Sequence, residues 1–177
     1  MKQLFITLLC LGFSIAGIAA DRALAVQVGE QAPSLTFTDV HVDGGKKTFN
    51  LSDLKGKVVV LEYWGPFCGP CIKAFPHINQ LVETFKNEDV RFISIADQGY
   101  AGCKKVLARH PLKTWQVFDV ALFTPFWVNA MPRTIIIGKD GTVAAYTTPK
   151  KLTEKVLRRV LKGEKTASHY NKSDFKP

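Results

Sequence analysis

The sequence predicts an α/β protein in which helices flank a mixed central sheet. Three near-continuous apolar runs, at residues 58–64, 90–96 and 134–137, are typical of strands covered on both faces. Apolar residues spaced by three and four follow the first run and recur over residues 152–161, which indicates amphipathic helices. An order of strand–helix–strand and then strand–strand–helix combines parallel and antiparallel strands in one sheet.

The composition fits one globular domain with short accessory segments. The chain has 177 residues, of which 46% are hydrophobic and 22% charged. These values exclude a disordered chain, a collagen and a multi-span membrane protein. Four cysteines are too few for a disulfide-rich scaffold. We predict a domain over residues 26–162, preceded by a targeting segment and followed by a basic tail at residues 163–177.

The first 25 residues are typical of a secretory signal peptide. Lys2 precedes an apolar run at residues 4–20, and Ala23 and Ala25 form a small-residue cleavage site. Cleavage is expected after Ala25, with Ala20 as the second choice. An uncleaved membrane anchor is the alternative, because 17 apolar residues lie at the short end of what spans a bilayer. Either way, the domain is expected outside the cytoplasm, periplasmic or secreted.

The region before the first buried strand predicts a β-hairpin that extends the domain at its N-terminus. Residues 26–33 read as an extended lead-in. Residues 35–40 and 47–51 read as strands on either side of an Asp-Gly-Gly turn at 43–45. One short helical turn is expected at residues 52–56.

The remaining elements follow from the same patterns. In chain order, we predict a helix from Cys71 to Phe85, a strand at 90–96, a helix at 101–110, a strand at 115–118, a helical segment at 120–128, two strands at 134–137 and 143–147, and a last helix whose apolar stripe runs from Leu152 to Leu161.

The net charge of +9 is concentrated near the C-terminus. Residues 150–177 hold nine Lys and Arg against three Asp and Glu. A solvated helix face and tail is the simplest interpretation, and weak contact with an anionic membrane surface or an acidic partner is the alternative. Aromatic and basic residues do not alternate as in a nucleic-acid surface, so no nucleic-acid partner is expected.

The motif Cys68-Gly69-Pro70-Cys71 carries the chemistry. It follows a buried strand and opens a helix, where unpaired N–H groups and the helix dipole stabilise a thiolate. Cys68 is therefore expected to have a pKa below the usual ~8.5 and to act as the nucleophile. Cys71, one turn further on, is expected to resolve the mixed disulfide. A zinc site would need two more ligands, and a purely structural disulfide would close too small a loop. No metal or other cofactor is expected.

The motif and its surroundings resemble the thioredoxin superfamily, and within it the extracytoplasmic TlpA- and ResA-like thiol-disulfide oxidoreductases. The features that carry the resemblance are Trp64 before the motif, Pro76 in the following helix, Met131-Pro132 before a strand, and N-terminal segments at 28–33 and 51–57. It covers roughly residues 28–162. It implies the thioredoxin fold and a cis Met131–Pro132 bond opposite the cysteines. It also implies substrate binding by Trp64, Gly69, Pro70, Met131 and Pro132.

The resemblance also implies a function outside the cytoplasm. The Gly-Pro dipeptide is similar to that of reducing members, so we expect a reductase of protein disulfides. Its electrons would come from a membrane donor of the DsbD or CcdA type, and apocytochrome c is the first substrate expected. Two alternatives remain, a thiol peroxidase of the peroxiredoxin type and a non-catalytic peptide-binding module. A peroxiredoxin has its cysteine in a P-x-x-x-T/S-x-x-C pattern, which this sequence lacks. The intact cysteine pair argues against a non-catalytic module.

Glu62 is a charged residue inside an apolar strand. Burial would raise the pKa of its carboxyl, so Glu62 is expected to accept the proton of Cys71 during resolution. In this respect the chain resembles thioredoxins, which have a buried Asp at the position of Glu62. The TlpA and ResA type has Asn here and a Glu where this chain has Ala74.

Two further residues carry hypotheses. Cys103 is expected to be a buried, inert thiol, with a regulatory or intermolecular disulfide as the alternative. Arg133 follows Pro132, and a cation beside the active site would favour the thiolate or acidic substrates.

Overall fold

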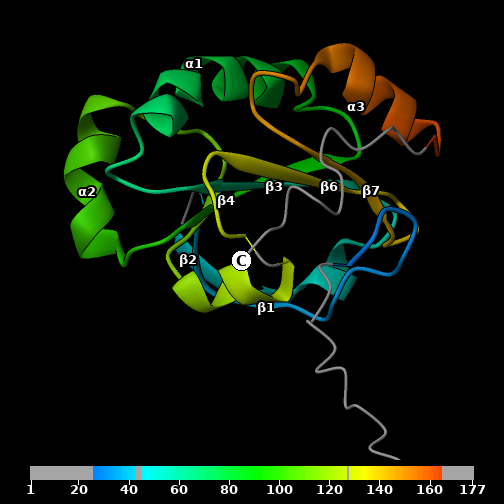
Figure 1. The fold of residues 1–177 in the computed structure, drawn as a ribbon, viewed down its shortest axis with the longest axis horizontal. Coiled ribbons are helices and arrows are strands. Elements are labelled where there is room, and N and C mark those ends of the chain that lie inside the picture. The colour runs from blue at the N-terminus through cyan, green and yellow to red at the C-terminus, as the bar shows by residue number, and fades with distance from the viewer. Residues whose placement is uncertain (1–25, 43–44, 127, 165–177) are drawn as a thin grey trace, which may run out of the picture.

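The computed structural model describes residues 26–42, 45–126 and 128–164. In this part of the chain, seven strands form one mixed sheet in the order β2-β1-β5-β4-β3-β6-β7 (Figure 1). The strands are β1 (Thr36–Val42), β2 (Gly45–Asn50), β3 (Val58–Trp64), β4 (Val90–Ala96), β5 (Trp115–Val117), β6 (Arg133–Ile137) and β7 (Val143–Thr147). Strands β3, β4 and β5 are parallel, whereas β6, β7 and the β1–β2 hairpin pair antiparallel. The predicted mixed α/β sheet is confirmed.

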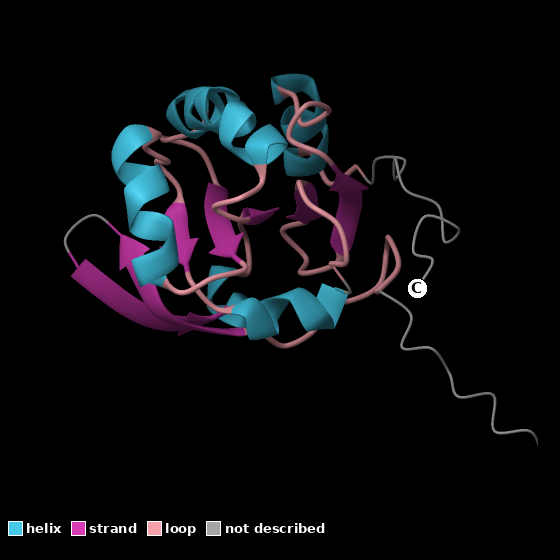
Figure 2. Ribbon diagram, turned by 60° about the vertical axis from the view of Figure 1, so that its left-hand side comes forward, coloured by secondary structure: helices cyan, strands magenta, loops and turns pink. Residues whose placement is uncertain are grey.

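Helices lie on both faces of the sheet (Figures 1 and 2). One face carries α1 (Gly69–Thr84), α2 (Tyr100–Arg109) and α3 (Glu154–Leu161), and the other carries two 3-10 helices, η1 (Leu51–Leu54) and η2 (Val120–Phe126). The helical turn predicted at residues 52–56 and the segment at 120–128 are thus 3-10 and not α. Both are short, and Pro125 interrupts the second, which favours the tighter helix in connecting segments.

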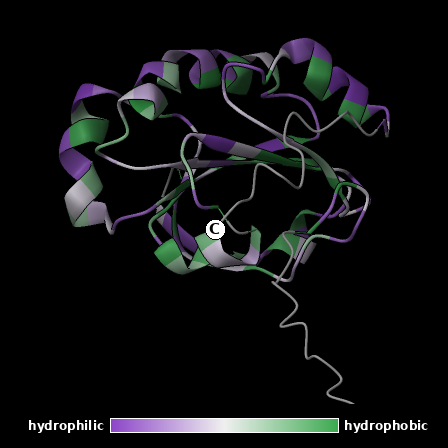
Figure 3. Ribbon diagram, viewed as in Figure 1, coloured by the Kyte–Doolittle hydropathy of each residue, from purple (hydrophilic) through white to green (hydrophobic). Residues whose placement is uncertain are grey.

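Strand β3 separates two hydrophobic cores. Val58, Val60 and Trp64 belong to the core under α1 and α3, whereas Leu61 and Tyr63 belong to the core under η2 and the hairpin. Figure 3 shows hydrophobic residues along the central strands and hydrophilic stretches on the outer helices. Side chains alternate between the two faces of a strand, so this alternation decides which β3 side chains lie on the side of α1 and α3.

The N-terminal lead-in pairs with β7. Gly29 and Ala32 donate backbone hydrogen bonds to the carbonyls of Val143 and Gly141, at 2.8 and 3.0 Å, and Val143 donates to Glu30 at 2.8 Å. The strands of the predicted hairpin are present, while its turn at 43–44 lies outside the described residues.

The described chain contains no helix of the length and apolar character that a membrane crossing requires. The predicted signal peptide, residues 1–25, lies outside the described residues. So does most of the predicted tail, because the description ends at Glu164.

Candidate active site

The cysteine pair lies where β3 passes into α1. Cys68 and Cys71 are joined by a disulfide, with their Cα atoms 5.2 Å apart. Cys68 is half-buried, whereas Cys71 is 1% exposed and packs in the core beneath the helix. Gly69 and Pro70 between them are exposed. One sulfur is therefore accessible from outside and the other is covered.

Cys68 caps the N-terminus of α1. The helix begins at Gly69, two residues before the position predicted from the apolar pattern. The Cys68 sulfur accepts a hydrogen bond from the Cys71 backbone N–H at 3.2 Å, and the Cys68 N–H donates to Gly65 at 3.0 Å. Pro70 fits the first turn because its missing N–H would have no partner there. The sulfur thus lies at the positive end of the helix dipole.

The loop before β6 lies beside the motif. The Met131–Pro132 bond is cis, as the resemblance implied. Because β6 runs antiparallel to β3 and Arg133 pairs with Tyr63, the start of β6 meets the end of β3. Pro70 and Pro132 line one cavity, and Met131 packs against the core that contains Cys71. The fold therefore brings the Gly69-Pro70 and Met131-Pro132 segments to the same edge of the sheet.

Trp64 does not fit the predicted contact with substrate. Its side chain is 0% exposed and packs edge-on against Phe75, with ring centroids 5.1 Å apart. Its position at the end of β3 turns its side chain into the core, where it packs in the same cluster as Cys71. Phe67, by contrast, is 88% exposed directly before Cys68. Its place next to the nucleophile was the available signal.

Glu62 is buried on the face of β3 that carries α1. It is 3% exposed, and the alternation of β3 places it on the same side as Val60 and Trp64, the side of Cys71. Thr134 on β6 donates a hydrogen bond to one carboxyl oxygen. Burial raises the pKa of Glu62 well above its usual 4.5, and the Thr134 hydrogen bond opposes that rise. Burial therefore favours the protonated form of this carboxyl more than solvent would.

Arg133 lies on the opposite face, which corrects the hypothesis of a cation beside the cysteines. Arg133 is 3% exposed and alternates with Thr134, whose hydroxyl reaches Glu62 on the active face. Its charge instead acts on Tyr146, a residue of the other core. Arg133 therefore faces the core under η2 and the hairpin, and the sequence hypothesis is wrong because it ignored strand alternation.

Cys103 is a free, buried thiol in α2, as predicted. Its sulfur donates to the Gln98 carbonyl at 3.5 Å, and it packs in the core shared with Cys71. Burial, assisted by the negative charge of Asp97, raises the pKa of Cys103 to about 11. The thiol is therefore protonated and inert at neutral pH.

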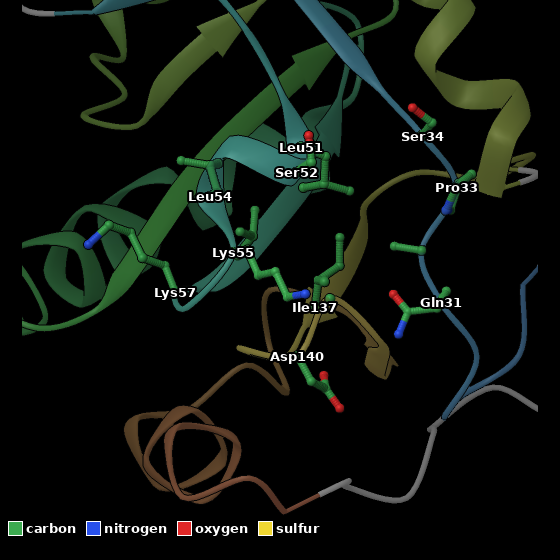
Figure 4. Close-up of a pocket in the computed structure, with 14 residues that line it drawn as sticks. Gln31, Pro33, Ser34, Leu51, Ser52, Leu54, Lys55, Lys57, Ile137 and Asp140 are labelled. Carbon is green, nitrogen blue, oxygen red and sulfur yellow. The ribbon is translucent and has the colours of Figure 1, made fainter.

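Two cavities differ in their distance from the cysteines. One, of about 290 Å³, lies between the lead-in and η1 at the far end of β3; Figure 4 shows Gln31 and Ser34 on one side of it and Leu51 and Leu54 on the other. No cysteine or histidine is among the described residues that line it. The other, of about 570 Å³, includes Pro70 and Pro132. Neither cysteine lines the second cavity, but Pro70 lies between Cys68 and Cys71 in the chain, so this cavity adjoins the motif.

The comparisons with known proteins agree with this geometry. The model of the Redoxin family matches residues 27–161. The chain belongs to the Redoxin family. It is 34% identical over 148 residues to "Thiol-disulfide oxidoreductase ResA" of Bacillus cereus, a match covering 80% of this chain and 83% of the relative. The protein of the same name from Bacillus subtilis (strain 168) is 30% identical over 153 residues, covering 82% and 81%.

A solved structure resembles this Redoxin-family chain over the same region. It is that of a putative thiol:disulfide interchange protein DsbE from Chlorobium tepidum. It is 27% identical, has a TM-score of 0.66 and covers 77% of this chain and 99% of its own. Together with the two cysteines on either side of Gly-Pro, these matches identify a thiol-disulfide oxidoreductase with the thioredoxin fold, similar to TlpA and ResA.

Proposed function

We propose that this Redoxin-family protein reduces disulfides of protein substrates outside the cytoplasm. The Cys68 thiolate attacks a substrate disulfide and releases one substrate thiolate. Cys71 then attacks the sulfur of Cys68 in the mixed disulfide, releases the second substrate thiolate and leaves the Cys68–Cys71 disulfide. Two electrons pass to the substrate, which gains two protons. The observation that carries the proposal is the disulfide at the N-terminus of α1, beside the Pro132 loop.

Exposure supports the division of roles between the cysteines. Cys68 is accessible at the N-terminus of α1, where a thiolate is favoured, and Cys71 is covered by the core. In a Cys71→Ser variant, the first step should proceed and the second should not. Mixed disulfides with substrates should therefore accumulate through Cys68.

Glu62 is proposed as the proton acceptor for Cys71. It lies on the same face of β3 as that cysteine, and burial raises the pKa of its carboxyl, which favours uptake of a proton. Gly69, Pro70, Met131 and Pro132 are proposed to bind the substrate polypeptide.

A reductase in an oxidising compartment needs a source of electrons. A membrane donor of the DsbD or CcdA type is proposed to reduce the Cys68–Cys71 disulfide after each turnover. The cysteines of apocytochrome c, in cytochrome c maturation, are the first substrates proposed. The signal-peptide pattern of residues 1–25 supports a periplasmic or secreted location.

The direction of electron flow is tested by the reduction potential of the cysteine pair. We expect a value near that of thioredoxin, about −270 mV, and reduction of insulin disulfides by the dithiol form. A Cys68→Ser variant should have no insulin activity. A potential near −120 mV, as in strong oxidants, would reverse the proposed direction. Rapid consumption of hydrogen peroxide, with no activity on insulin, would support the thiol-peroxidase alternative.

A further inference from the structure

The cavity that Pro70 and Pro132 line has apolar residues in both of its walls. One wall is a single face of α1, formed by Pro70, Lys73, Ala74 and His77 at spacings of three and four. The opposite wall is Pro132 and the segment 148–150 that follows β7. Three prolines and an alanine form half of this lining, and prolines offer no backbone N–H to a ligand. Such a lining suits an apolar side chain of a polypeptide.

The rim of the cavity is cationic. Lys73 and Lys150 are exposed on opposite walls, and neither forms an ion pair with any residue that the structure describes. No carboxylate lines this cavity in the described parts of the chain. Other surface lysines, such as Lys57 and Lys113, are paired with carboxylates. The charge at the rim is therefore available to a bound partner.

His77 fixes the shape of the α1 wall. Its Nε2 lies 2.7 Å from the Leu152 carbonyl oxygen, and because a carbonyl only accepts, Nε2 carries the proton. This hydrogen bond joins α1 to the segment that leads into α3. The two walls are thus held at a set separation, which a rigid binding cavity requires.

We infer that this cavity selects protein disulfides whose cysteines are flanked by an apolar residue and by acidic residues. The inference rests on the proposed reductase function and names its substrate class. An apolar side chain next to the attacked cysteine packs against the prolines and Ala74 of the cavity, and the acidic residues lie against Lys73 and Lys150. Exposed ion pairs of this kind change affinity by a few-fold each, so two lysines give a preference of about tenfold over basic flanks.

The test uses reduced protein and a series of oxidised peptides in single-turnover mixing. Each peptide carries one intramolecular disulfide and a Leu beside the cysteine, with Asp, Asn or Lys at the flanking positions. The second-order rate constant should fall in the order Asp, Asn, Lys, and the Asp-to-Lys ratio should shrink as salt concentration rises. Replacing the Leu by Ser should lower the rate constant.

A charge-reversal variant tests the two lysines. In Lys73→Glu, Lys150→Glu, the Asp-to-Lys ratio should invert. Because the ratio is taken within one variant, any change in the reactivity of Cys68 cancels. Lys47→Glu, Lys55→Glu changes the net charge equally at exposed positions outside this cavity and should keep the wild-type ratio.

The outcomes separate this inference from the proposed function. If wild-type protein reduces all three peptides at one rate, or if both double variants shift the ratio alike, the cavity does not select by charge, although the reductase function stands. Equal rates for the Leu and Ser peptides would show that the apolar lining of the cavity does not contribute to substrate selection. If the wild-type dithiol reduces none of the peptides, the reductase function itself fails.

Discussion

At the scale of single residues, Cys68 and Cys71 differ in what surrounds their sulfur atoms. Cys68 is half-buried at the end of α1, and Cys71 is covered by the core. In reduced protein at mildly acidic pH, iodoacetamide should therefore label Cys68 well before Cys71, and peptide mapping by mass spectrometry measures the order. Cys103 serves as an internal control that stays unlabelled, because its thiol is buried and protonated. Preferential labelling of Cys71 would reverse the assigned roles.

Glu62→Gln separates the two steps of exchange. The variant keeps the size and hydrogen-bonding capacity of the side chain but removes the base. Mixed disulfides with Cys68 should form at a near-normal rate, while their resolution should slow by about 100-fold. Rapid-quench kinetics resolve the two steps. If resolution matches wild type from pH 6 to 9, water takes the proton and Glu62 has no catalytic part.

The same variant has a pH-dependent effect on stability. Above pH 4.5 the unfolded chain loses the Glu62 proton, whereas the folded protein keeps it up to its raised pKa. The free energy of unfolding therefore falls as pH rises through this window, by about 1.4 kcal/mol for each unit of the rise in pKa. Glu62→Gln lacks this loss, so its stability relative to wild type should increase as the pH rises from 4.5, as measured by urea denaturation. A constant difference across that range would show that the folded state does not shift this carboxyl.

The sequence predicted the burial of Glu62 because it lies within an apolar strand, and that of Cys103 because a free cysteine is among the residue types most often buried. The structure does not fit the substrate contact that the resemblance implied for Trp64, or the hypothesis for Arg133. Trp64 lies four residues before Cys68, and the alternation of side chains along β3 turns it into the core. Arg133 stands next to Pro132, but the same alternation sends it to the other face of the sheet. Nearness along the chain did not decide which face a side chain occupies.

At the scale of elements, the buried strands were predictable because each is a compact apolar run. The nature of η1 and η2 was not, since a few polar residues and a proline do not distinguish a 3-10 helix from an α-helix. The cavity could not be predicted from the sequence either. Its walls come from residues 70–77, 132 and 148–150, which meet only when β6 pairs with β3.

The start of α3 depends on one cap. Thr153 accepts a hydrogen bond from the Val156 N–H at 3.3 Å, and its loss leaves a helix N–H without that partner. Thr153→Ala should lower the free energy of unfolding by about 0.5–2 kcal/mol in urea denaturation. Thr153→Ser keeps the hydroxyl and should remain near wild type. If Ala and Ser behave alike, the cap contributes nothing to stability.

At the scale of the whole molecule, α3 is the last helix that the structure describes, and the Redoxin match ends at residue 161. Truncation after Lys162 removes the exposed Arg159–Glu164 ion pair but keeps Leu157 and Val160 in the core. Reduction of insulin disulfides should therefore be unchanged in the truncated protein. The full-length chain assayed at the same concentration is the control. A large loss of activity would show that residues 163–177 complete the active site.

The two walls of the cavity give this architecture an evolutionary consequence. The α1 wall shares its helix with Cys68 and Cys71, so substitutions there alter partner choice and reactivity together. The 148–150 wall carries none of the proposed catalytic groups and follows the last strand, just before Thr153. Duplicated copies of such a gene can therefore diverge toward new partners through three codons, while the exchange chemistry that they inherit stays unaltered.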